Sequence, residues 1–315
     1  MNTGTNSINR LYLVLIFTVS AWTNIAFCGE IHDAAKAGNL EQIKTLLRTN
    51  PFLIDIKGEY DLTPLVYACG YQNKAVIKFL LEQGAKVDTK PDPLTEAVLG
   101  NADIEIVSLL LQKGANPNAN DQWGSSVLLN AVLGADTRNK GGPIDEQLTQ
   151  QRTEIINILL KAGANPESGH IEKDGSIFTP LMAATAHNLP GVTKLFLENK
   201  ANVNAQCRGL TALAFAARNN NIEIIQLLLE SGADVNAGTT SPLHLAARGG
   251  NIEAIKILIA HNANVDSTDS KGQTALEYAQ ALLDAREEEH QEKASAQVIG
   301  LRNAIQLLRE QKAKK

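Results

Sequence analysis

The stretch Ser241-Pro242-Leu243-His244-Leu245-Ala246-Ala247, followed by Gly250-Asn251-Ile252-Glu253 and Asn262-Ala263-Asn264-Val265-Asp266, is the clearest copy of a unit that recurs eight times along the chain. The opening of the unit recurs as Thr63-Pro64-Leu65, Thr179-Pro180-Leu181, Thr211-Ala212-Leu213 and Thr274-Ala275-Leu276. Its tail recurs as Gly84-Ala85, Gly114-Ala115, Gly163-Ala164, Ala201-Asn202 and Gly232-Ala233. Self-similarity at a nearly fixed period predicts an architecture in which stacked neighbours bury a shared core.

The sequence pattern of each unit predicts a pair of helices. A hydroxyl or carboxylate side chain precedes the first helix, where its oxygen accepts a free backbone N–H. The expected N-caps are Thr63, Asp92, Ser126, Thr179, Thr211, Ser241 and Thr274. Proline follows the cap in four units, at a helical position that needs no N–H donor. The second helix carries an apolar stripe and ends at a glycine such as Gly232, because glycine readily adopts positive φ at a helix C-terminus. Lys200 stands where four other units have this glycine.

With several motifs in register, the chain from about Gly29 to its C-terminus resembles the ankyrin-repeat family. The resemblance implies an all-α solenoid of about eight helix-turn-helix units with finger loops. We place the units at about residues 29–60, 61–90, 91–124, 125–176, 177–209, 210–239, 240–272 and 273–315. The last unit has apolar residues at helical spacing from Val298 to Leu308, so it is expected to pack back on the seventh unit as a cap. The family's histidine, matched by His244, usually bonds neighbouring turns.

The fourth unit is longer than the others. From Val127 to Pro180 the spacing is 53 residues, which is about 20 more than the 33-residue period. Most of the excess falls at residues 135–152, where the breaker Gly141-Gly142-Pro143 precedes a polar, helix-prone stretch. We therefore expect a loop and then an N-terminal extension of the second helix. The remainder, Glu167 to Ser176, is expected to lengthen a finger.

Residues 1–28 differ in kind from the repeats. Arg10 precedes an apolar run from Leu11 to Val19, and small residues at Ala26 and Cys28 fit cleavage before Gly29. This pattern predicts a secretory signal peptide and an exported protein. An uncleaved membrane anchor is the alternative, because Leu11 to Cys28 is close to the shortest span of a bilayer. A lipid-modified Cys28 is disfavoured, because bulky Phe27 precedes it.

The composition does not favour nucleic acid as a partner. The full chain has a formal charge of −5, from 29 Lys and Arg against 34 Asp and Glu. Nucleic-acid binding depends on clustered basic residues, and no such cluster is visible in the sequence. Contact with a membrane is expected only through an uncleaved N-terminus, and the protein is expected to be a monomer.

The sequence gives almost no support for catalysis. The histidines are scattered over different units as His32, His170, His187, His244, His261 and His290. No Cys or His group has metal-ligand spacing, and no nucleophile has a base at a recognisable distance. We therefore expect no enzyme activity, cofactor or metal. Cys69 and Cys207 lie in distant units and are expected to be free thiols, with Cys207, near a finger tip, the more accessible.

The expected function is protein binding through the fingers and the first helices. The candidate contact residues are Tyr60 and Trp123 near finger tips, and Tyr71, Leu99, Leu133, His187, Arg218 and Arg248 at the ends of first helices. Exposed aromatic and arginine side chains often anchor interfaces. The alternative for Trp123 is packing against a neighbouring finger, and for Leu99 packing against an adjacent helix.

Three functional hypotheses follow. The first is an exported binding module that supports or protects a partner in the periplasm or outside the cell. The second is a secreted effector that acts on host proteins, and the third is a membrane-tethered scaffold that keeps its N-terminal segment.

Overall fold

The computed structural model describes residues 29–100, 103–134, 146–288 and 296–314. The predicted signal peptide and residues 135–145 of the predicted insertion lie outside the described residues. The chain divides into two compact units, one ending at Trp123 and the other beginning at Gly124. We describe each unit by itself.

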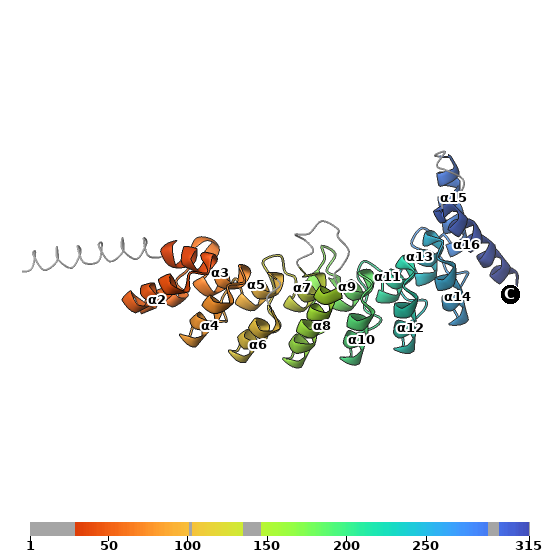
Figure 1. Ribbon diagram of the computed structural model, residues 1–315. Helices are drawn as coiled ribbons and strands as arrows, with labels where there is room; N and C mark the ends of the chain where they lie inside the picture. The colour runs from red at the N-terminus through yellow and green to blue at the C-terminus, as the bar shows by residue number, and fades with distance from the viewer. Residues whose placement is uncertain (1–28, 101–102, 135–145, 289–295, 315) are drawn as a thin grey trace, which may run out of the picture. The chain divides into compact units, whose positions relative to one another are not determined.

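The first unit is a stack of three helix pairs. A helix over residues 29–37 pairs with α2 (Leu40–Thr49), and the short 3₁₀ segments η1 (Pro51–Asp55) and η2 (Glu59–Asp61) follow. The next pairs are α3 (Pro64–Gly70) with α4 (Lys74–Glu82), and α5 (Pro93–Leu99) with α6 (Ile104–Gln112). First helices pack on first helices and second helices on second helices, as α3 does on α5 and α4 on α6 (Figure 1).

The second unit continues the same pattern through five pairs. These are α7 (Val127–Leu133) with α8 (Glu146–Lys161), α9 (Pro180–Ala186) with α10 (Pro190–Glu198), α11 (Ala212–Asn219) with α12 (Ile222–Glu230), α13 (Pro242–Gly249) with α14 (Ile252–Ala260), and α15 (Ala275–Glu288) with α16 (Ala296–Ala313). Together with the three pairs of the first unit, the described residues therefore contain eight helix pairs, which confirms the predicted all-α fold of helix-turn-helix repeats.

The predicted N-caps explain where the first helices begin. The side-chain oxygens of Thr63, Asp92, Ser126, Thr179 and Thr211 each accept the backbone N–H three residues later. Thr274 forms a reciprocal pair with Glu277, because its Oγ1 accepts the Glu277 N–H while the Glu277 carboxylate accepts the Thr274 N–H. Ser241 was expected to cap α13 in the same way, and this detail is wrong: its side chain bonds His244 instead.

The long fourth pair differs from the others in the two places that the sequence predicts. Helix α8 has 16 residues, whereas α4, α6, α10, α12 and α14 each have 9. The finger that follows α8 forms a hairpin, in which β1 (His170–Ile171) pairs antiparallel with β2 (Ile177–Phe178).

Helix α16 closes the second unit. Its buried residues are Val298, Leu301, Ala304, Ile305 and Leu308, and the helix packs on α13, α14 and α15. Two glycines approach each other closely there, because a Cβ added to Gly250 would lie 2.6 Å from the carbonyl carbon of Gly300. The expected cap on the seventh pair is therefore present, and only a side chain as small as glycine permits this contact.

Both described cysteines are free thiols, as predicted. The expected accessibility of Cys207 is wrong, because its side chain is only 3% exposed. The finger folds back on itself there, with reciprocal hydrogen bonds of 2.9 Å between the backbone groups of Cys207 and Leu210. Cys69 is completely buried, and loss of hydration raises the pKa of its thiol.

Candidate protein-binding surface

Six of the eight predicted contact residues lie at the C-terminal ends of first helices. Tyr71, Leu99, Leu133 and His187 end or follow their helices, and Arg218 and Arg248 lie in the last turns of α11 and α13. The positions correspond closely because α3, α5, α7 and α9 have 7 residues each and α11 and α13 have 8. Tyr71, His187, Arg218 and Arg248 are exposed, whereas Leu99 and Leu133 are half-buried.

In the first unit, the finger loops enclose a groove of about 570 Å³. The first loop supplies Tyr60 and Asp61, the second supplies residues 88–92, and the third supplies Asn116 and residues 118–122. Thr95 and Glu96 of α5 complete the lining. Of the predicted finger residues, Tyr60 lines this groove, together with residues of the first helix α5.

The backbone around Tyr60 turns its side chain outward. Tyr60 adopts φ 58° and ψ 28°, and Asp61 also has positive φ, at 60°. A left-handed conformation is uncommon for a bulky residue, and here it leaves the tyrosine 79% exposed. Neither the conformation nor the groove is apparent from the sequence, because both depend on how the three loops meet.

Trp123 follows the third loop of the groove. Its backbone N–H donates to Asp121 Oδ1 over 2.9 Å, and its side chain is 65% exposed. Most of the indole therefore lies in solvent.

The base of the groove is formed by the cap of α5. Asp92 Oδ1 accepts the Thr95 N–H over 2.8 Å and lies 3.1 Å from Thr95 Oγ1. Burial raises the pKa of Asp92, although these two hydrogen bonds lower it in part. Asp92 therefore has a structural role, while the more exposed carboxylates of the groove supply its surface charge.

In the second unit, Arg218 belongs to a small aromatic cluster. Its guanidinium carbon lies 5.3 Å from the centre of the Phe215 ring, and Phe215 meets Phe178 edge to face at 5.8 Å. Cation–π and edge-to-face contacts of this kind hold a long side chain in a defined position. The sequence predicted Arg218 but not the two half-buried phenylalanines, because Phe178 comes from the hairpin and Phe215 from α11.

The hairpin also presents an apolar pair. Ile171 and Ile177 are partners across the two strands, so their side chains lie on the same face, and they are 65% and 39% exposed. Glu172 in the same finger forms an ion pair with Arg208 of the next finger. This salt bridge and the phenylalanine contact fix the hairpin to its neighbour.

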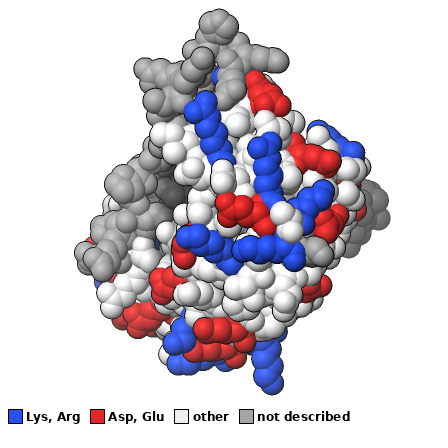
Figure 2. Space-filling view, turned by 90° about the vertical axis from the view of Figure 1, so that its right-hand side faces the viewer, with Lys and Arg blue, Asp and Glu red and all other residues white. Residues whose placement is uncertain are grey.

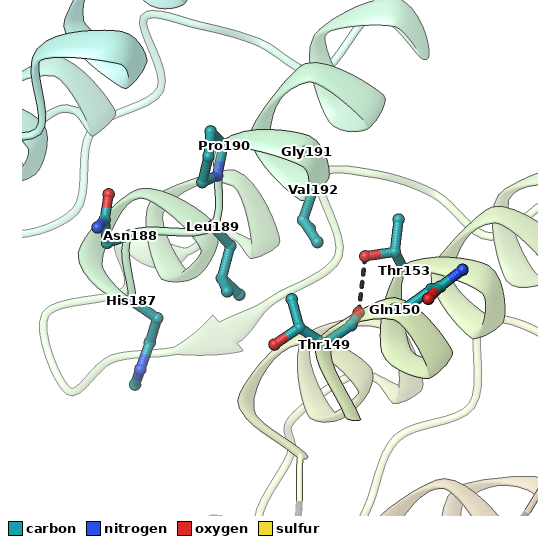
Figure 3. A pocket seen from close by; sticks show the side chains of 9 residues that line it. All are labelled: Thr149, Gln150, Thr153, His187, Asn188, Leu189, Pro190, Gly191 and Val192. Carbon is teal, nitrogen blue, oxygen red and sulfur yellow. Dashed lines mark hydrogen bonds between the residues drawn. The ribbon is translucent and has the colours of Figure 1, made fainter. Parts of the chain in front are cut away.

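His187 lines a separate hollow of about 670 Å³ in the second unit. Figure 3 shows His187 and Leu189 of the turn between α9 and α10 on one side and Thr149, Gln150 and Thr153 of α8 on the other. Thr153 Oγ1 donates to the Thr149 carbonyl over 2.8 Å, so this hydroxyl is used within the helix. Among the residues that the structure describes, His187 is the only titratable one in the lining, and no acidic side chain lies beside it there.

His244 has the structural role that the resemblance implied. Its Nε2 donates to the Gln273 carbonyl over 2.9 Å, and its Nδ1 is hydrogen-bonded to Ser241 Oγ over 2.8 Å. The ring is 1% exposed. His244 therefore links the start of α13 to the finger before α15, and Ser241 bonds the His244 ring instead of a backbone N–H of the helix.

The surface carries charges of both signs. Figure 2 shows the end that carries α16, and on this face Lys and Arg side chains are interspersed with Asp and Glu. Within the described ranges, no three His, Cys, Asp or Glu side chains are placed to hold a metal ion. Among the same residues, no helix has both the length and the apolar composition needed to cross a bilayer.

Known proteins share this architecture. The family profile described as ankyrin repeats, in three copies, matches residues 31–121, 148–239 and 237–287. The ankyrin repeat and SOCS box protein 11 of Mus musculus is 34% identical over 137 residues, which are 41% of this chain and 42% of that protein. The Homo sapiens protein of the same name is 34% identical over 112 residues, 34% of each chain. The chain thus spans less than half the length of these curated relatives.

A solved structure supports the same fold. The crystal structure of the human ASB11 ankyrin repeat domain has a TM-score of 0.51 and 22% sequence identity, over 88% of this chain and 96% of that one. The identity is low enough that the likeness concerns the fold alone. With the family profile matching well over half of the residues and eight helix pairs in the described structure, the chain belongs to the ankyrin-repeat family.

Proposed function

We propose that the chain is an exported, non-catalytic protein-binding module that supports or protects a partner protein in the periplasm. Ankyrin repeats are protein-interaction modules, and that much follows from the family. Export rests on the pattern of residues 1–28 alone, with Arg10, an apolar run and small residues before Gly29.

The observation that carries the proposal is the repeated presentation of exposed side chains from equivalent positions. Tyr71, His187, Arg218 and Arg248 lie at the ends of α3, α9, α11 and α13, each on a helix whose other residues are mostly buried. A rigid helix that presents an exposed aromatic or arginine side chain provides a preorganised contact, which reduces the entropy lost on binding. In each unit, the partner would contact these positions and the fingers beside them.

A pull-down with a multiple variant tests the binding surface. Tyr71→Ala, Arg218→Ala and Arg248→Ala together should reduce capture of partners from an extract of the native compartment sharply. The melting temperature should change little, because exposed substitutions usually alter stability by less than about 0.5 kcal/mol each. The matched control replaces Glu198, Glu230 and Lys256, three exposed residues of the second helices, by alanine. Equal capture by the first variant and the parent would refute the assignment of this surface.

Intact-mass analysis tests export. The mature protein should begin at or within a few residues of Gly29 and fractionate as soluble. If residues 1–28 were retained in a membrane pellet, the tethered scaffold would replace this proposal. Detection in the cytosol of a host cell would instead favour the effector hypothesis.

A further inference from the structure

The groove in the first unit has an unbalanced charge. Among the described residues, its lining contains Asp61, Asp88, Asp92, Glu96 and Asp121 but only one basic residue, Lys90. Asp61 lies 3.8 Å from Lys57, where both side chains are well exposed, and water screens such pairs strongly. For Asp88, the described residues show no ion pair. The groove therefore presents a negative potential that its own lysine does not neutralise.

The groove also offers an aromatic edge and hydrogen-bonding groups. Tyr60 of the first loop forms part of the lining and is 79% exposed. Trp123 is next in the chain to Gln122, which lines the groove from the third loop. Exposed aromatic faces attract Lys and Arg, and the attraction increases when the cation is also desolvated. The remaining lining is rich in amides and hydroxyls, which suit the backbone of an extended chain, and it includes Asn116, Asn118, Asn120, Gln122, Thr89 and Thr95.

From this chemistry we infer that the groove receives an extended segment of the protein partner that carries Lys or Arg side chains. This inference rests on the proposed binding function and specifies the chemistry of the partner. The volume of about 570 Å³ lies within the range of about 300–1,000 Å³ typical of specific ligand pockets. The basic side chains would meet Asp61, Asp88 and Asp121 and lie against Tyr60.

Peptide binding tests the inference directly. The probes are a fluorescently labelled synthetic peptide of alternating Lys and Gly, its counterpart with Glu in place of Lys, and a neutral counterpart with Ser. Fluorescence anisotropy with the purified full chain should show binding of the lysine peptide only. Its affinity should fall as NaCl is raised from about 50 to about 300 mM, because added salt shortens the Debye length.

Isosteric variants locate the contact. Asp61→Asn, Asp88→Asn and Asp121→Asn together should weaken binding of the lysine peptide at least about tenfold and flatten its salt dependence. The fold should survive, because asparagine tolerates the positive φ of position 61 and can still accept the Trp123 N–H at position 121. The matched control removes three exposed charges of the second unit through Glu154→Gln, Glu198→Gln and Glu230→Gln and should bind like the parent.

Two substitutions at position 60 test the aromatic contribution. Tyr60→Phe should retain affinity for the lysine peptide, whereas Tyr60→Leu, which keeps an apolar side chain without a ring, should lose several-fold. Equal binding of the lysine and glutamate peptides, or equal loss in the matched control, would overturn the inference. If the lysine peptide fails to bind while partner capture still depends on Tyr71, Arg218 and Arg248, the basic-segment inference fails and the proposed function stands.

Discussion

At the scale of single residues, the ends of the second helices show how one backbone conformation is met by different side chains. Gly84, Gly114, Gly163 and Gly232 have φ between 86° and 93°. Lys200 takes the same place with φ 62°, and Asn262 with φ 67°. Positive φ costs a residue with a Cβ more than it costs glycine. Lys200 therefore replaces the glycine of the other units, and the turn keeps its left-handed backbone conformation.

Replacing Lys200 with glycine should stabilise the protein. Because the backbone is already left-handed there, Lys200→Gly should raise the free energy of unfolding by roughly 0.5–1 kcal/mol. Urea denaturation followed by far-UV circular dichroism measures the change. The reverse control is Gly232→Ala, at the equivalent position of the next unit, which should destabilise by a similar amount. A destabilised Lys200→Gly would show that contacts of the lysine side chain outweigh its backbone strain.

At the scale of elements, asparagines before α4, α12 and α14 connect these helix pairs to the previous ones. Nδ2 of Asn73 donates to the carbonyls of Ala35 and Lys36. Asn251 does the same to Ala217 and Arg218. The last carbonyls of a helix have no partner within the helix. Each asparagine therefore donates to free carbonyls at the end of the first helix in the preceding pair, and these bonds fix how one pair is offset from the other.

Ion pairs join the second helices of the first unit, and they predict a pH dependence. Lys74 and Lys78 of α4 contact Glu105 of α6. Hydrogen bonds from these lysines lower the pKa of Glu105 from 4.5 to about 2. Because the folded pKa lies below the unfolded one, the stabilisation is complete above about pH 4.5 and is lost as the pH falls through about 2.

Removing the Glu105 carboxylate should therefore weaken that dependence. In Glu105→Gln, the melting temperature should fall less steeply between pH 4.5 and about 2 than in the parent. The matched control is Glu223→Gln, at the second position of α12 as Glu105 is of α6, and for Glu223 the described residues show no ion pair. The control should keep the slope of the parent, and parallel curves for Glu105→Gln and the parent would exclude a contribution from these pairs.

At the scale of the whole molecule, stability comes from apolar layers between neighbouring helix pairs. In repeat proteins each pair contacts only its neighbours, so the stability is approximately a sum of local terms. Leu228 of α12 is completely buried, and α12 packs on both α10 and α14. The apolar stripe that the sequence shows in this helix is thus part of the core of the second unit.

Truncating that side chain should destabilise the repeats around it. Leu228→Ala should cost about 2–5 kcal/mol, because the rigid stack cannot close the cavity that remains. Hydrogen exchange measured by mass spectrometry should show the largest loss of protection in α10, α12 and α14. The half-buried Leu229 of the same helix provides the control, and Leu229→Ala should cost clearly less. Equal effects of the two substitutions would mean that Leu228 is not a core residue.

The sequence by itself determined the repeat, the order of helices and their ends. It could do so because these features depend on residues close together in the chain: a cap such as Thr63 bonds a backbone group three residues away, and the apolar stripes have the period of a helix. The resemblance added the family and its protein-binding role. The extension of α8 and the lengthened finger were predicted for the same local reason, from spacing and helix propensity.

Only the tertiary structure decided which side chains come together. It brought Phe178 to Phe215 and Arg218, buried Cys207, and assembled a groove from three loops that are distant in the sequence. These contacts depend on how loops and helices of neighbouring repeats meet in space, which the repeat pattern does not encode. Repetition specifies stacking because the same apolar layer recurs, whereas a binding surface arises where individual substitutions from several repeats meet.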